Sequence, residues 1–239
     1  MIDIDFNKLL HSVTYYLSYQ DNIGRSFMVN ESSLKYPVTD YLTSLKMSLA
    51  NIQLEFARPD LWKRNLDLIT TDQPDKKLAQ KIETAYEFKM ASQNTKYELE
   101  QKRIFNDLMR LYLIGKSNEA SSYFIMVGTQ KDYIQYFRSI VTIRPITNNQ
   151  KLPVPQGFYA EWFAFKVGET KTFDIKNASK DYKDVYEAFQ RDYKAKDGKA
   201  ILDLPDNLTT KCIAISALSR KFPTPYVGGI WKIEASTNP

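Results

Sequence analysis

Between residues 84 and 91 the chain reads Thr84-Ala85-Tyr86-Glu87-Phe88-Lys89-Met90-Ala91, an apolar segment with a glutamate and a lysine two residues apart. Alternate side chains of a strand point to the same face of a sheet, so a strand here would place Glu87 and Lys89 on one face. The earlier segment Leu66-Asp67-Leu68-Ile69-Thr70 carries an acid between apolar neighbours. If it forms a neighbouring strand, Asp67 joins the pair. Such a charged group on a sheet is costly unless it binds something, and a divalent cation with a phosphate diester fits that need.

The flanking segments predict the order of the elements. Asn30-Glu31-Ser32-Ser33 is typical of a helix start, and the helix would run to about residue 50. Apolar residues alternate in three short segments within 51–91, which predicts an antiparallel meander. Helical spacing returns over 96–114, with Gly115 suited to a helix end. The continuous apolar run at 123–128 is typical of a central strand covered on both faces.

The second half of the chain predicts an extension of this core. The segment from residue 145 to residue 155 holds three prolines and is the best candidate for a linker. We therefore expect a core with N-terminal helices over 1–145 and a C-terminal α/β extension over 146–239. The extension would complete the sheet. Within it, Gly228-Gly229 predicts a bend or a bulge.

Composition limits the classes of function. The 239 residues are 43% hydrophobic and carry a net charge of +5, which permits a polyanionic partner without requiring one. The single cysteine, Cys212, excludes an internal disulfide and a cysteine zinc cluster, and the single histidine, His11, excludes a multi-histidine metal site. No apolar run approaches the roughly 20 residues that cross a bilayer, and the acidic start lacks the features of a secretion signal. These features predict a cytoplasmic protein without a membrane partner.

The order helix, meander, helix and apolar strand, with an acid in the second strand and Glu-x-Lys in the third, closely resembles the core of the PD-(D/E)xK nuclease superfamily. Asp67, Glu87 and Lys89 carry the resemblance, which covers about residues 30–130. It implies a restriction-endonuclease-like fold, in which helices flank a central mixed β-sheet. The extension over 146–239 would then supply DNA contacts, dimer contacts or both.

The resemblance also implies roles for individual residues. Asp67 and Glu87 would bind Mg²⁺, together with the main-chain carbonyl of Phe88, and Mn²⁺ could substitute. Magnesium takes hard oxygen ligands and keeps several waters, one of which can attack a phosphodiester. Lys89 would orient that water, help to deprotonate it or offset charge on the phosphate. Glu31 would touch the metal through water.

Three charged residues of the second helix lie outside the defining motif. Arg103, Asp107 and Arg110 fall at helical spacing on the side away from the apolar stripe. We assign them to the edge of the site as candidate nucleic-acid contacts. The alternative is a solvated helix face with weak ion pairs.

The resemblance implies a Mg²⁺-dependent endodeoxyribonuclease that cuts double-stranded DNA, of the type II restriction or related defence class, and a homodimer would allow two strands to be cut. Three alternatives stay open. The first acid could be Asp60, in the literal Pro59-Asp60 dipeptide, rather than Asp67. The chain could be a catalytically inactive nucleic-acid-binding or structural protein of the same fold. Finally, the Glu87 and Lys89 motif could be coincidental, either on a solvated edge strand with a cross-strand charge pair to Asp67 or in an unrelated α/β domain.

Overall fold

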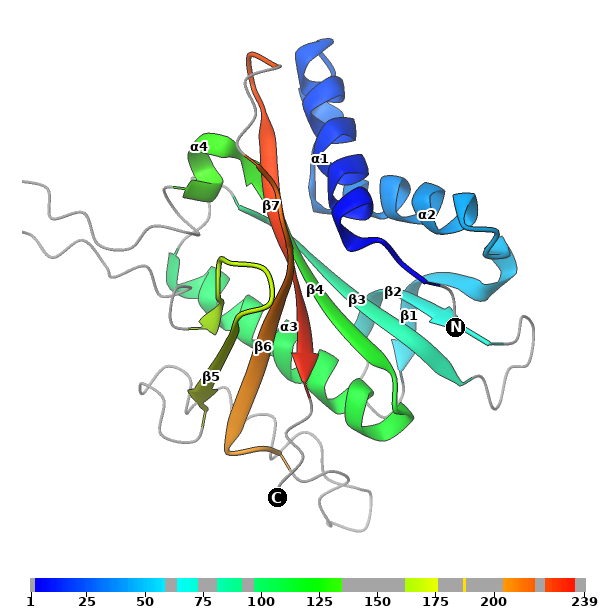
Figure 1. Ribbon diagram of the computed structural model, residues 1–239, viewed down its shortest axis with the longest axis vertical. Helices are drawn as coiled ribbons and strands as arrows, with labels where there is room; N and C mark the ends of the chain where they lie inside the picture. Colours follow the sequence, from blue (N-terminus) through cyan, green and yellow to red (C-terminus); the bar gives the residue numbers. More distant parts are fainter. Residues whose placement is uncertain are drawn as a thin grey trace, which may run out of the picture.

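One mixed sheet organises the protein. The computed structural model describes residues 3–58, 64–72, 81–91, 97–134, 162–175, 187, 204–217 and 222–234. In these ranges seven strands pair in the order β1-β2-β3-β4-β7-β6-β5 (Figure 1). Their bounds are β1 (Ile52–Arg58), β2 (Arg64–Thr71), β3 (Ile82–Ala91), β4 (Ser121–Thr129), β5 (Thr170–Asp174), β6 (Asn207–Ile215) and β7 (Tyr226–Glu234).

Helices cover both faces of the sheet. Helix α1 begins after Asp5, whose carboxylate caps the helix by accepting hydrogen bonds from the N–H groups of Asn7 and Lys8. Helices α1 and α2 cover one face and α3 covers the other (Figure 1). No helix of the described ranges is both long and apolar enough to span a bilayer. The helical bounds are α1 (Phe6–Asn22), η1 (Ser26–Met28), η2 (Glu31–Leu34), α2 (Lys35–Ser44), η3 (Leu49–Asn51), α3 (Tyr97–Asn118) and α4 (Gln130–Asp132).

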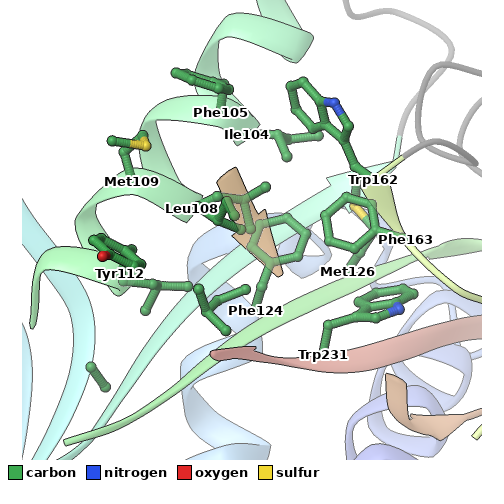
Figure 2. Packing of buried hydrophobic residues seen from close by; sticks show 14 of the residues in the cluster. Ile104, Phe105, Leu108, Met109, Tyr112, Phe124, Met126, Trp162, Phe163 and Trp231 are labelled. Atoms are coloured by element: carbon green, nitrogen blue, oxygen red, sulfur yellow. The ribbon is translucent and has the colours of Figure 1, made fainter. Parts of the chain in front are cut away.

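The core between α3 and the sheet fixes that helix in place. Figure 2 shows Leu108 of α3 beside Phe124 of β4, whereas Phe105, one turn earlier on α3, packs against Trp162 with ring centroids 5.6 Å apart; Leu108, Phe124 and Phe105 are fully buried. The buried Trp231 of β7 packs against Phe163, with ring centroids 4.8 Å apart. Buried aromatic side chains of this size contribute much of the stability of a core. Helix α3 is therefore held firmly over β3 and β4, and its polar residues have fixed positions relative to those strands.

The topology confirms the coarse fold prediction. Strands β1, β2 and β3 form the expected antiparallel meander, and β4 pairs parallel to β3 after the crossover through α3. Strand β4 is covered on both faces: Phe124 and Met126 lie in the cluster with α3, whereas Ile125 lies in the cluster with α1 and α2. Strand β7 pairs antiparallel between β4 and β6, so strands from beyond residue 146 belong to the same sheet.

Some local predictions were wrong. Helix α2 ends at Ser44 rather than near residue 50, and α3 continues through Gly115 to Asn118. A Cβ at Gly115 would lie 3.2 Å from Oγ of Ser122, so the glycine permits close packing and does not end the helix. Gly228 and Gly229 pair in regular register with β4. The irregularity lies in β6 instead, between Cys212 and Ala214.

Burial makes the reactivity of Cys212 a test of this fold. The side chain is fully buried, and burial, assisted by the negative charge of Glu169, raises the pKa of the thiol to about 11. The thiolate is the reactive form, so a disulfide reagent at pH 8 should modify native protein only as fast as it unfolds. Absorbance of the released thiol would measure this rate, with protein in guanidinium chloride as the fast reference. Equally rapid modification of native protein would contradict the buried position.

Candidate functional site

Strand β3 carries the central pair of the candidate site. Glu87 and Lys89 share the face of the sheet that α3 covers, and their residues are 1% and 8% exposed. Strand β3 pairs with β2 on one side and with β4 on the other. The solvated edge-strand alternative for these two residues is therefore wrong.

Strands β2 and β3 separate at Asp67. The pairing of β2 with β3 ends at Leu68 opposite Tyr86. On its other side, β2 still pairs with β1 from Leu66 back to Arg64. Oδ2 of Asp67 accepts the Phe88 N–H at 2.9 Å, so a side chain replaces the missing ladder bond. We call this separation, with Asp67, Glu87 and Phe88 around it, the fork.

Helix α3 reaches the fork from one face. Nη2 of Arg110 lies 3.0 Å from Oε1 of Glu87 and also pairs with Asp107, one turn earlier. Nη1 of Arg110 donates to the main-chain oxygen of Asn65 in β2 at 3.3 Å. Oδ2 of Asp107, in turn, lies 3.2 Å from Nζ of Lys89. Asp107 is 3% exposed, so the expectation that it lies away from the buried side of the helix was wrong.

The segment η2–α2 reaches the same residues from its own side. Oε1 of Glu31 accepts a hydrogen bond from Nζ of Lys89 at 2.9 Å. One helical turn later, Nζ of Lys35 lies 3.2 Å from Oδ1 of Asp67 and also donates to Glu55 of β1. Both carboxylate oxygens of Asp67 are thus engaged, one by Lys35 and the other by Phe88.

Burial raises the pKa values of three acids of this cluster, Glu87, Asp107 and Glu31. The pKa of Glu87 lies well above its ordinary value. The main cause is burial, and the negative charges of Asp107 and Asp67 add to it, whereas the positive charge of Arg110 offsets only part of the shift. Burial likewise raises the pKa of Asp107 in spite of Lys89 and Arg110. Burial also raises the pKa of Glu31, although Lys89 opposes it.

The two lysines remain charged. Burial alone would lower the pKa of Lys89, but the carboxylates of Asp107 and Glu31 raise it above the ordinary value. Lys35 behaves in the same way, because Glu55 and Asp67 outweigh its burial and raise its pKa. Both side chains are therefore ammonium ions at neutral pH.

The cluster holds more negative than positive groups. Within the described ranges, these contacts connect five carboxyl groups with three cations, which leaves two negative charges if all of them are ionised. Oε1 of Glu87 and Oδ2 of Asp107 are buried and make ion pairs, but neither has a hydrogen bond of good geometry. Buried charge of this kind is costly without a further partner. The members are Glu31, Glu55, Asp67, Glu87, Asp107, Lys35, Lys89 and Arg110.

Most residues singled out from the sequence come together here. Six of them lie around the fork and are linked by its contacts, and the Phe88 N–H donates to one of them, whereas the Arg103 side chain is exposed one turn before Asp107 on α3. The alternative first acid, Asp60, lies outside the described residues. The six are Asp67, Glu87, Lys89, Glu31, Asp107 and Arg110.

Sequence reasoning missed Lys35 and Glu55. Lys35 follows Glu31 by four residues, a spacing that puts two side chains on one helix face, so the position of Glu31 could have indicated it. Glu55 gave no such signal, because it looks like the solvent-facing member of an alternating strand.

The donor set at the fork fits a magnesium ion in type and number. Asp67 and Glu87 offer hard carboxylate oxygens, and the Phe88 N–H orients the Asp67 carboxylate. In the described ranges, no three acidic, histidine or cysteine side chains converge as a protein cage for a metal would require. Magnesium usually takes one or two carboxylates and completes its shell with waters and substrate phosphates, so two acids suffice.

Comparison of the chain with protein-family models, with curated proteins and with solved structures found no match. The residues around the fork and their chemistry are therefore the basis for assigning a function.

Proposed function

We propose that the chain is a Mg²⁺-dependent endodeoxyribonuclease of the restriction-endonuclease-like class, with its active site at the fork. The observation that carries the proposal is the placement of Asp67, Glu87 and Lys89 on the adjacent strands β2 and β3, in a cluster that holds more carboxyl groups than cations; Glu87 and Lys89 are buried and Asp67 is partly buried. The order α2, β1, β2, β3, α3, β4 supports it, because it follows the order of elements on which the resemblance depends.

Each residue would have a distinct task. When bound, Mg²⁺ would supply an activated water and a Lewis acid for the phosphate. Asp67 and Glu87 would hold the ion, and the hydrogen bond from Phe88 fixes the orientation of the Asp67 carboxylate. Lys89, held by Glu31 and Asp107, would orient the attacking water and offset negative charge on the phosphate.

One observation favours the inactive alternative. Glu87 already has Arg110 as a cation, and Asp67 already has Lys35, so the cluster can also be a structural charge network. Ion-pair networks of this kind occur without catalysis and perturb pKa values in the same way. In that case the protein would bind nucleic acid or a partner without cutting it.

Cleavage of supercoiled plasmid and of linear phage DNA with Mg²⁺ tests the proposal. We expect the wild type to convert plasmid to open circles or to discrete bands, and a chelator to stop the reaction. Asp67→Asn should abolish cleavage. Asp60→Asn makes the same chemical change seven residues earlier and is the matched control, expected to keep activity.

The other outcomes separate the alternatives. Loss of cleavage in Asp60→Asn alone would move the first acid to Asp60. Equal cleavage by all three proteins would indicate a contaminant and remove the fork from the mechanism. DNA binding by gel shift with no cleavage in Mg²⁺ or Mn²⁺ would support the inactive protein.

A further inference from the structure

Lys35 is a second buried lysine beside the fork. It is the first residue of α2, and its side chain is 8% exposed. Its ammonium group lies 3.2 Å from Oδ1 of Asp67, and Oδ2 of the same carboxylate accepts the Phe88 N–H. Contacts to both oxygens restrain rotation of the carboxylate plane.

Glu55 keeps Lys35 in this position at a conformational cost. It is a strand residue with φ +50, in the left-handed region that residues other than glycine, asparagine and aspartate rarely adopt. The register of β1 and β2 places Glu55 opposite Asp67, between the pairs Leu54–Leu68 and Phe56–Leu66. Like charges at opposing strand positions destabilise a sheet, and here the Lys35 ammonium bridges the two carboxylates.

Backbone strain of this kind persists where the surroundings enforce it and clusters at functional sites. We infer that Lys35, tied back by Glu55, is a positioning residue for Asp67: it holds the carboxylate in the orientation in which Asp67 and Glu87 receive a divalent cation. This inference rests on the proposed function, because it concerns the same site. It adds two residues that lie outside the Asp67, Glu87 and Lys89 motif.

The affinity of the Lys35→Met variant for Mn²⁺ distinguishes two roles of Lys35: positioning the Asp67 carboxylate, or only repelling the cation. A positive charge that only repelled the ion would, on removal, tighten binding. A positioning residue should, on removal, weaken binding by roughly 10–100-fold, the usual effect of losing a group that orients a metal ligand. Isothermal titration of the intact chain with Mn²⁺ gives the dissociation constant. Equal or tighter binding by Lys35→Met would overturn the inference.

A double-mutant cycle shows whether Glu55 acts through Lys35. Glu55→Gln should weaken Mn²⁺ binding in the wild-type background and have little effect beside Lys35→Met, because its partner is already gone. An equal effect in both backgrounds would mean that Glu55 acts by its own charge, which contradicts the inference. Glu169→Gln is the matched control: its carboxylate is similarly exposed, at 53% against 57%, and it lies beside β5 at the other edge of the sheet.

Two measurements separate this inference from the proposed function. Wild-type protein that takes up no Mn²⁺ would overturn both. Wild-type binding that Asp67→Asn abolishes and Lys35→Met leaves intact would overturn only the role of Lys35. Thermal unfolding in a chelator checks that each variant folds. If Lys35→Met does not fold, the Mn²⁺ affinities of Glu55→Gln and Glu169→Gln still test the inference. Equal affinities of these two variants would overturn it.

Discussion

Glu87→Gln is expected to lower DNA cleavage by roughly 10²–10³-fold and to raise the stability of the protein. The loss of activity follows because one preorganised charged group at a reaction centre typically contributes that much to the rate. The gain in stability follows because Glu87 is buried beside Asp107 and Asp67, which raises its pKa. At neutral pH the folded chain must either keep this buried carboxylate ionised or protonate it. Both cost free energy in the folded state and not in the unfolded state, so both lower the free energy of unfolding.

Plasmid cleavage and thermal unfolding of the same preparations measure the two effects. Glu83→Gln is the matched control, because Glu83 lies on the same strand four residues earlier and is only partly buried. It should leave both quantities close to the wild type. Opposite signs for activity and stability are typical of active sites that sacrifice stability for function. A lower melting temperature for Glu87→Gln would instead indicate that the carboxylate is part of a stabilising network.

Arg110→Met is expected to destabilise the fold by about 3–5 kcal/mol, the usual cost of leaving a buried charge without its partner. Arg110 contacts the acids Glu87 and Asp107 and also donates to the Asn65 carbonyl across the fork. Its removal therefore leaves two buried carboxylates close together and removes a link between α3 and β2. Urea unfolding measures the difference.

Two further variants test the cause of this loss. Arg103→Met removes the same charge from an exposed position of the same helix, so it should change the free energy of unfolding by at most about 0.5 kcal/mol. Adding Glu87→Gln to Arg110→Met should restore part of the stability, because one of the two stranded acids is then neutral. Strictly additive changes would argue against electrostatic coupling between these residues.

The sequence indicates much of the site because strand periodicity is a local property. The spacing of Glu87 and Lys89 puts them on one face whatever surrounds them, and the apolar neighbours of Asp67 mark it as a strand residue. The depth of Asp107 depends instead on how α3 lies on the sheet. A polar residue beside an apolar stripe looks solvent-facing until the strand beneath supplies Lys89 as its partner.

The errors share a cause, which is contact between distant segments. Gly115 was interpreted as a helix end, whereas it allows α3 to approach Ser122. Gly228 and Gly229 were interpreted as a bend or a bulge, whereas they pair in regular register with β4, and side chains there would collide with the Met126 carbonyl and the Trp231 ring. Glu55 has a left-handed conformation that no local pattern announces, since it depends on Lys35 and Asp67.

The position of β7 between β4 and β6 also has a consequence for synthesis on the ribosome. Strand β4 can pair with β3 as soon as both have emerged, but its other edge stays unpaired until residues 226–234 follow, about a hundred residues later. Such an apolar, open edge is a template for association with other chains. The nascent protein should therefore depend on chaperones during this interval, and expression at a lower temperature should increase the yield of native protein.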